Sequence, residues 1–174
     1  MDQLISDVKA AIRDVPDFPK DGVLFKDITP MLADPALFSR VIRWFAHPYE
    51  PERIKTVVGM ESRGFIFGGA LSNALHAGFA PARKAGKLPW ETVSKSYALE
   101  YGEATLELHA DAIQPGDKVL ICDDLLATGG TAAATVDLVR ELGGVIVGCA
   151  IVIELDFLKG REKLDVPVRS LIHY

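Results

Sequence analysis

The sequence has little of what membrane, secreted and nucleic-acid-binding proteins need. It contains no apolar run of about 18 residues and begins with no charged-then-apolar leader, so neither a membrane span nor secretion is predicted. Its 19 Lys and Arg are outnumbered by 24 Asp and Glu, which argues against a general nucleic-acid binder. The cysteines, Cys122 and Cys149, lie in apolar runs typical of buried, reduced thiols. We therefore expect a cytoplasmic protein with no membrane or nucleic-acid partner.

Several common ligand signatures are also missing. The sequence contains no Gly-x4-Gly-Lys-Ser/Thr loop and no Gly-x-Gly-x-x-Gly after a strand, so neither a Walker A loop nor a dinucleotide site is supported. The four histidines show no metal-ligand spacing. What the chain does have is 174 residues, 49% of them hydrophobic, which suffice for one sizeable core. We expect a single domain over residues 1–174.

Apolar runs alternate with helical patterns over most of the chain. The patterns predict helices at about 4–15, 35–46, 65–75 and 131–142, and strands at 54–60, 79–83, 104–110, 117–122 and 145–153. Most of these strands are continuously apolar, which is typical of a parallel sheet covered on both faces. The sequence therefore predicts an α/β fold with a mostly parallel, twisted sheet and helices on both faces.

Two stretches fall outside this alternation. Residues 16–34 are rich in turn formers yet partly apolar, and they predict a small irregular hood. The polar region 84–103 is much longer than the roughly two to six residues usual for α/β connections. We expect it to be a long, mobile, functional lid.

One stretch combines features that attract opposite ligands: VLICDDLLATGGT, at residues 119–131. Asp123 and Asp124 follow a buried strand, and ligands of such sheets bind beyond the carboxyl ends of the strands. The Gly-rich turn after them opens a helix whose N–H groups and dipole attract phosphate. Carboxylates suit ribose hydroxyls, or Mg²⁺ held through water. A sugar with a 5′-phosphate satisfies both halves, and the structural alternative is an ordinary strand followed by a capped helix.

The stretch resembles the phosphoribosyl-diphosphate (PRPP) binding motif of the type I phosphoribosyltransferase family. Together with SRGFIFG, RKAGKLP and SYALEYG, it is similar to the adenine-using branch of that family. The likeness extends from FPKDGVLFKDIT near the start to LKGREKL and SLIHY at the end. It implies a type I phosphoribosyltransferase fold, a homodimer, Mg²⁺ as cofactor, and a purine salvage reaction in which adenine and PRPP give AMP and pyrophosphate.

The resemblance implies a role for each part of the phosphoribosyl site. The 5′-phosphate would be held by Ala127, Thr128, Gly129, Gly130 and Thr131. Asp123 and Asp124 would take the ribose hydroxyls and, through water, Mg²⁺. The residues expected on the leaving pyrophosphate are Ser62, Arg63, Arg83, Lys84 and Lys87. Of these, Arg63 is also expected to assist catalysis, because it can stabilise the charge of the leaving group.

The resemblance also implies residues for the base. Glu100 matches the family's acid/base residue, which would handle a proton at N9 or N7 of adenine. Tyr101 beside it belongs to the lid, where it would orient the site or simply pack. The residues expected to contact adenine are Phe25, Lys26, Asp27 and Leu125. Lys26 stands where the family often has arginine, so purine affinity would change if the side chain makes the contact.

A purely structural or surface role stays open for several of these residues. Arg63 and the cations near residue 84 would otherwise be solvated surface charges, Glu100 a hinge residue, and Phe25 part of a core. Two other functions also stay open. One is transfer to a 6-oxopurine or orotate, against which the LEYG stretch and the N-terminal hood argue. The other is a non-enzymatic PRPP-sensing regulator, against which the acidic charge and the lack of a further domain argue.

Overall fold

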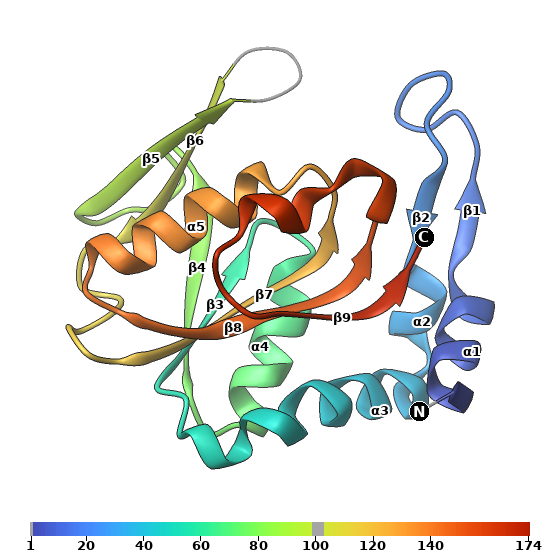
Figure 1. The fold of residues 1–174 in the computed structure, drawn as a ribbon, viewed down its shortest axis with the longest axis horizontal. Coiled ribbons are helices and arrows are strands. Elements are labelled where there is room, and N and C mark those ends of the chain that lie inside the picture. The colour runs from blue at the N-terminus through green and yellow to red at the C-terminus, as the bar shows by residue number, and fades with distance from the viewer. Residues whose placement is uncertain (1, 99–102) are drawn as a thin grey trace. The chain divides into compact units, whose positions relative to one another are not determined.

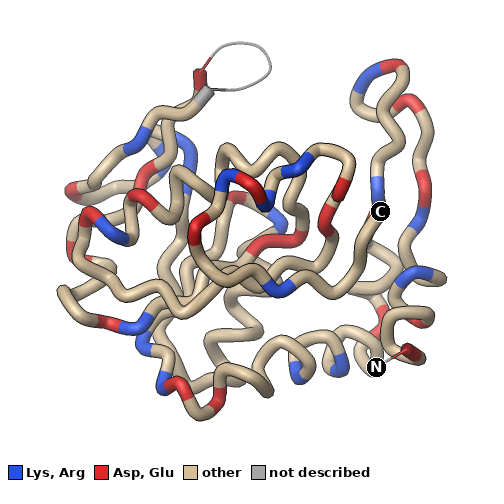
Figure 2. The backbone as a smooth tube through the Cα atoms, in the orientation of Figure 1, with Lys and Arg blue, Asp and Glu red and all other residues tan. Residues whose placement is uncertain are grey.

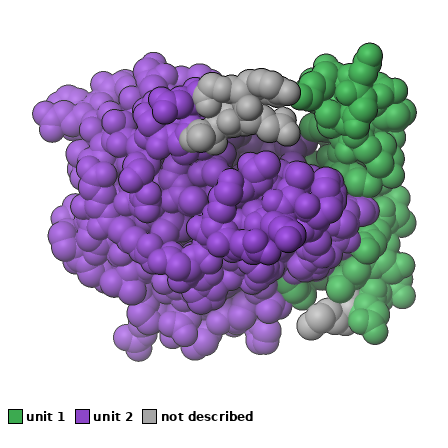
Figure 3. Space-filling model, turned by 45° about the horizontal axis from the view of Figure 1, so that its top comes forward, with its two compact units in different colours: residues 1–44 green, residues 45–174 purple. Residues whose placement is uncertain are grey.

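The computed structural model describes residues 2–98 and 103–174 (Figure 1). The chain divides into two compact units, Met1–Trp44 and Phe45–Tyr174 (Figure 3). Basic and acidic residues are interspersed along the backbone of both units (Figure 2). Among the described residues, no helix is both long and apolar enough to cross a membrane. The expectation of a single domain stays a prediction.

The first unit begins with helix α1 (Asp2–Ala11), which ends earlier than its apolar stripe predicted. The chain then enters strand β1 (Arg13–Val15), which pairs antiparallel with β2 (Phe25–Asp27). Proline disfavours helical geometry in the residue before it, so Pro16 pushes Val15 into an extended conformation. The prediction of helix up to residue 15 is therefore wrong in its last turn.

The predicted hood, residues 16–34, is more regular than expected, because it contains β2 and the short helix α2 (Thr29–Ala33). The next helix, α3 (Pro35–Ala46), agrees with the prediction at both ends. Asp34 caps it by accepting a hydrogen bond from the N–H of Ala36 at 2.9 Å. A favoured capping residue followed by proline explains why this boundary was readable.

The second unit contains a seven-stranded sheet in the order β5-β6-β4-β3-β7-β8-β9 (Figure 1). Its strands are β3 (Thr56–Met60), β4 (Gly78–Lys84), β5 (Thr92–Ala98), β6 (Glu103–His109), β7 (Lys118–Leu126), β8 (Val145–Glu154) and β9 (Val168–His173). The pairs β4–β3, β3–β7, β7–β8 and β8–β9 are parallel, whereas β6 pairs antiparallel with β4 and β5. The predicted mostly parallel sheet is confirmed.

Helices flank the sheet, α5 (Gly130–Glu141) in front of it and α4 (Gly64–Ala74) behind it in Figure 1. Two glycines allow α4 to lie close to the strands. A Cβ at Gly59 of β3 would come 2.7 Å from the ring of Phe79, and one at Gly68 of α4 would come 2.8 Å from the same ring. The described part of this unit also contains three short 3-10 helices: η1 (His47–Glu52), η2 (Asp156–Leu158) and η3 (Gly160–Lys163).

Strand β7 runs further than predicted, to residue 126 rather than 122. Its parallel partner β8 continues to pair with it, so that Asp123 lies opposite Ile151 and Leu126 opposite Glu154. The two acids, Asp123 and Asp124, therefore lie within the last residues of the strand rather than beyond it. Pairing with a long neighbour outweighs the low intrinsic preference of aspartate for strands.

The described residues of the region 84–103 include a strand that the sequence did not predict. Its residues 92–98 form β5, and Val93 of this strand lies opposite Leu108 of β6. A strand was not predicted here because the segment is mostly polar, although Val93 and Tyr97 lie on the same side of it. We call β5 and β6 together the arm. The mobile, functional lid expected at residues 84–103 stays a prediction.

Candidate active site

A cavity of about 280 Å³ opens at the carboxyl ends of the adjacent parallel strands β3 and β7. Ligands of open parallel sheets bind in this position. Three segments contribute to the lining: the loop after β3, the end of β7, and the turn that leads into α5. The lining residues are Glu61, Ser62, Arg63, Asp123, Asp124, Leu125, Leu126, Ala127, Thr128, Gly129, Gly130, Thr131 and Ala132. The structure thus brings together both halves of the predicted phosphoribosyl site.

The turn of residues 127–131, which we call the phosphate turn, joins β7 to α5. Gly129 precedes the helix with φ +78°, in the left-handed region that glycine adopts without strain. The first N–H groups of a helix have no partner within it, and the helix dipole adds partial positive charge there. Thr128 and Thr131 bring hydroxyls to the same cavity wall. The turn therefore offers several donors to an anion.

The predicted acid pair lies beside this turn. Asp124 donates its backbone N–H to Oδ1 of Asp123 at 2.8 Å, and its own carboxylate is 2.7 Å from Nη2 of Arg63. Burial, reinforced by the charge of Asp124, raises the pKa of Asp123 well above its usual range. Burial also raises the pKa of Asp124, although Arg63 opposes that shift. Two carboxyl groups held this way favour ligands that supply hydroxyl donors or positive charge.

The loop after β3 approaches the acid pair closely. A Cβ at Gly64 would come 2.6 Å from Oδ1 of Asp123, so only glycine fits there without displacing the acid. Ser62 and Arg63, which are expected to bind pyrophosphate, precede Gly64 and line the cavity. Arg63 is bound to Asp124 here, so any anion that recruits its guanidinium must compete with that ion pair.

Glu61, which the sequence analysis did not single out, contacts the remaining predicted cations. Glu61 accepts hydrogen bonds from Nε of Arg83 at 3.2 Å, from the backbone N–H of Lys84 at 3.2 Å, and, at short range, from Nζ of Lys87. Burial disfavours the charge of Glu61, but these donors outweigh it and lower the pKa of its carboxyl group. Lys84 thus contacts Glu61 through its backbone, whereas Arg83 and Lys87 do so through their side chains.

The residues predicted to contact the base divide between the two units. Leu125 lines the cavity. Phe25 and Asp27 belong to the first unit, where a groove of about 220 Å³ is lined by Val15, Phe18, Phe25 and Asp27. The rings of Phe18 and Phe25 meet edge to face, with centroids 5.1 Å apart.

Polar neighbours hold the other two residues of this strand. Lys26 forms an ion pair with Asp14 at 2.6 Å, and Asp27 accepts a hydrogen bond from the N–H of Thr29 at 2.9 Å. Glu100 and Tyr101 lie outside the described residues.

The chain matches the model of the phosphoribosyl transferase domain family over residues 29–172. It is 56% identical to an adenine phosphoribosyltransferase of Nitrosococcus oceani over 168 residues, which cover 96% of this chain and 98% of that protein. The crystal structure of the Rhodothermus marinus adenine phosphoribosyltransferase superposes with a TM-score of 0.96, at 52% identity and over 100% of both chains. That of the Saccharomyces cerevisiae enzyme, complexed with an imino-altritol bisphosphate and adenine, superposes with a TM-score of 0.94, at 43% identity, covering 98% of this chain and 99% of the yeast chain. The chain therefore belongs to the phosphoribosyl transferase domain family and, within it, to the adenine phosphoribosyltransferases.

Proposed function

We propose that the protein transfers the 5-phosphoribosyl group of PRPP to adenine in purine salvage, giving AMP and pyrophosphate. The observation that carries this proposal is the single cavity lined by the phosphate turn, the acid pair and the loop of Arg63. The high identity to adenine phosphoribosyltransferases, and the presence of adenine in the yeast relative's crystal structure, support adenine as the acceptor.

In this reaction the bond from ribose C1 to the pyrophosphate oxygen breaks, and its electron pair leaves with the pyrophosphate. N9 of adenine forms the new bond to C1 and gives up its proton. Positive charge develops on the ribose ring between these two events, and fixed negative groups near the ring stabilise it. Asp123 and Asp124 would supply this field while accepting hydrogen bonds from the ribose hydroxyls.

The other residues would bind the two phosphate groups and move the proton. The phosphate turn would hold the 5′-phosphate through backbone N–H groups and the hydroxyls of Thr128 and Thr131. Ser62 and Arg63 would hold the leaving pyrophosphate, joined by Arg83, Lys84 and Lys87. Glu100 would serve as the acid/base for adenine, a role that rests on the family resemblance. The predicted adenine contacts of Phe25, Lys26, Asp27 and Leu125 rest on it as well.

The donor set of the cavity also fits the expected Mg²⁺. This ion takes oxygen ligands, keeps several waters and needs few carboxylates, and Asp123 and Asp124 offer carboxylate oxygens at the cavity wall. We propose that these two residues hold it through water. When bound, the ion would neutralise part of the charge that the pyrophosphate carries away.

The test is a base-competition assay with PRPP and Mg²⁺, in which adenine, guanine, hypoxanthine, xanthine and orotate are offered separately and together. AMP formed from adenine, with no nucleotide from the other bases, is the expected result. A nucleotide formed from a 6-oxopurine or orotate would assign a different transferase. PRPP binding by calorimetry without any nucleotide product would instead indicate a PRPP-sensing regulator.

The family resemblance further supports a homodimer in the cytoplasm. Sedimentation equilibrium of the purified protein tests the oligomeric state, and cell fractionation tests the location.

A further inference from the structure

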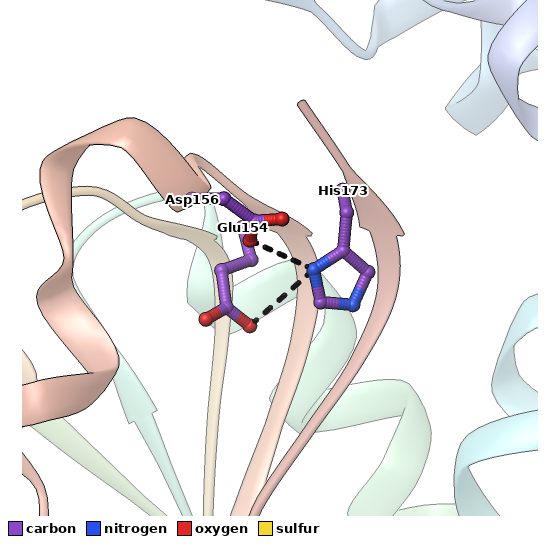
Figure 4. A group of neighbouring side chains, drawn as sticks. All are labelled: Glu154, Asp156 and His173. Carbon is purple, nitrogen blue, oxygen red and sulfur yellow. Dashed lines mark hydrogen bonds and ion pairs between the residues drawn. The ribbon is translucent and has the colours of Figure 1, made fainter.

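A second cluster of polar residues lies where β8 and β9 end, outside the cavity. Figure 4 shows Glu154, Asp156 and His173, with Nδ1 of His173 2.9 Å from Oδ1 of Asp156 and 3.9 Å from Oε2 of Glu154. The cluster has the residue types of a metal site, but the carboxylate of Glu154 is already engaged. Arg161 donates to both of its oxygens, from Nε to Oε1 at 2.8 Å and from Nη2 to Oε2. Both carboxylate oxygens of Glu154 are thus engaged by Arg161 rather than available to a metal ion.

Arg161 connects the last residue of β8 with the first half of β9. Besides Glu154 on β8, its guanidinium donates to the carbonyl oxygen of Val168 at 2.8 Å and to Oγ of Ser170 at 3.3 Å, both on β9. Ser170 in turn donates to Glu154. A planar guanidinium with both carboxylate oxygens engaged is held in one orientation. The carboxylate of this ion pair is buried, since Glu154 is only 4% exposed, whereas the side chain of Arg161 is 44% exposed.

The residue before Arg161 lies against the phosphate turn. A Cβ at Gly160 would come 2.2 Å from the carbonyl oxygen of Ala127 and 2.9 Å from the backbone nitrogen of Gly129. In the other direction, a Cβ at Gly129 would come 2.3 Å from the carbonyl oxygen of Gly160. The two backbones are therefore in direct contact with no side chain between them. If Gly160 moved toward the phosphate turn, it would displace the turn. If Gly160 moved away, the turn would lose its packing support.

The strands that carry these two segments are neighbours, which explains why the segments meet. Leu126, the last residue of β7, lies opposite Glu154, the last residue of β8. The N–H of Leu155 then donates to the carbonyl oxygen of Leu126 at 3.0 Å. The phosphate turn leaves one strand and the segment with η3 leaves the other, so they run side by side from the same edge of the sheet.

We propose that the ion pair of Glu154 and Arg161 positions the phosphate turn for the 5′-phosphate, by holding Gly160 against Ala127 and Gly129. Arg161 is thus a positioning residue, which does not touch the substrate but supports the backbone that does. This inference rests on the proposed function, because it assigns the 5′-phosphate of PRPP to the turn. Loss of the ion pair loosens the support, and small displacements of positioning groups weaken binding and catalysis strongly.

The first test replaces Arg161 and measures phosphate binding directly. In Arg161→Gln, the Kd of ribose 5-phosphate by calorimetry and the KM for PRPP should each rise about tenfold or more, whereas the KM for adenine stays within about twofold. The matched control is Arg140→Gln, which breaks the exposed ion pair of Arg140 with Asp165 at 3.0 Å, away from the turn. A folded Arg161→Gln protein that binds ribose 5-phosphate as tightly as Arg140→Gln does would overturn the inference.

Two further variants test the positioning role if Arg161→Gln does not fold. Arg161→Lys keeps the charge but loses the two-pronged contact, and it should weaken ribose 5-phosphate binding to an intermediate extent. Gly160→Ala leaves the ion pair intact and introduces the clash with Ala127, so it should give the same loss for PRPP with little change for adenine. Wild-type affinity for ribose 5-phosphate in both variants would overturn the inference.

The proposed function and the inference fail in different measurements. Absence of AMP formation by the wild-type protein contradicts the proposed function. Unchanged ribose 5-phosphate affinity in the variants, relative to a wild-type protein that forms AMP, contradicts only the positioning role of Arg161.

Discussion

The hydroxyl of Thr131 in the phosphate turn donates a hydrogen bond to the hydroxyl of Tyr97 on the arm, over 3.1 Å. A second contact, the ion pair of Lys95 with Asp137 at 2.9 Å, joins the same strand to α5. The arm is thereby attached to the helix that begins at the phosphate turn. If a phosphate occupied the turn, the hydroxyl of Thr131 would donate its hydrogen bond to the phosphate instead of to Tyr97. The hydroxyl of Tyr97 could then donate a hydrogen bond to the oxygen of Thr131.

Replacing Tyr97 with Phe should therefore affect PRPP more than adenine. The variant loses one half-buried hydrogen bond, at a cost of about 1 kcal/mol in the free energy of unfolding. We expect its KM for PRPP to rise by a factor of about 3 to 10, since Thr131 loses the partner that orients it. Steady-state kinetics with each substrate varied in turn measure this.

The control is Ser96→Ala, which removes the exposed hydrogen bond between Ser96 and Thr105 across the arm. It should leave the KM for PRPP unchanged. If Ser96→Ala and Tyr97→Phe shift this KM equally, the hydrogen bond to Thr131 has no part in PRPP binding.

Releasing the cations held by Glu61 should strengthen pyrophosphate binding. Arg83 and Lys87 are both bound to Glu61, and a pyrophosphate that recruits them must first break these ion pairs. In Glu61→Gln the competing charge is gone, so the Kd of pyrophosphate, measured by calorimetry, should fall by a factor of about 3 to 10. Product inhibition by pyrophosphate should strengthen in parallel.

Glu107→Gln provides the comparison, because Glu107 accepts a hydrogen bond from the N–H of Gly86 in the same connection. Its pyrophosphate affinity should match the wild type. Weaker pyrophosphate binding in Glu61→Gln would mean that Glu61 arranges the two cations for the ligand rather than withholding them.

The phosphate turn and the acid pair were predictable because their chemistry is contiguous in the sequence. A buried strand, two acids and a Gly-rich helix start lie within residues 119–131, and the fold only has to keep their order. Glu61 could not be found in the same way, because its partners Arg83 and Lys87 follow 22 and 26 positions later. They meet only because β3 and β4 pair side by side.

The other differences between sequence and structure also lie in segments that have no local side-chain pattern. The strand β5 is polar on much of its length and is defined by its pairing with β6. Gly160 supports Gly129 through a contact between backbones, for which no side-chain pattern exists. Periodicity detects elements that bury an apolar face, and it misses those that pairing alone defines.

The two cysteines should be unreactive in the folded protein. Both are buried, and burial raises the pKa of Cys149 to about 12 and that of Cys122 well above its usual range. At pH 8 only about one Cys149 in 10⁴ would carry the reactive thiolate. We expect no reaction of the native protein with Ellman's reagent over hours in buffer. In guanidinium chloride, the two thiols should release two equivalents of thionitrobenzoate. Rapid labelling of one thiol in the native protein would show that β7 or β8 opens locally.

The proposed acid/base role of Glu100 predicts a loss of turnover without a loss of PRPP binding. Glu100→Gln removes the titratable group, so kcat should fall by roughly 10²- to 10⁴-fold while the Kd of PRPP changes little. Glu103→Gln, an exposed position at the start of β6, is the matched variant and should keep wild-type kcat. A near-wild-type kcat in Glu100→Gln would remove the role.

The raised pKa of Asp123 predicts opposite effects of Asp123→Asn on stability and on substrate binding. A group whose pKa is higher in the folded chain than in the unfolded chain destabilises the fold as pH rises through the folded value. Burial and the charge of Asp124 place Asp123 in this class, so the Tm of Asp123→Asn at neutral pH should equal or exceed that of the wild type. The difference in Tm should vanish as pH falls to about 4, near the pKa of an unfolded aspartate.

PRPP binding should weaken, because the amide of the variant is a poorer acceptor than the carboxyl group for the proposed hydrogen bond from a ribose hydroxyl, at a cost of about 1 kcal/mol, or roughly fivefold in Kd. Asp165→Asn is the control, because the pKa of Asp165 is shifted in the opposite direction: its hydrogen bond with Arg140 lowers it. This variant should lose a little stability above about pH 4 and keep its affinity for PRPP. If Asp123→Asn is instead less stable at every pH and binds PRPP normally, Asp123 serves the fold, and the ribose must be held by Asp124 alone.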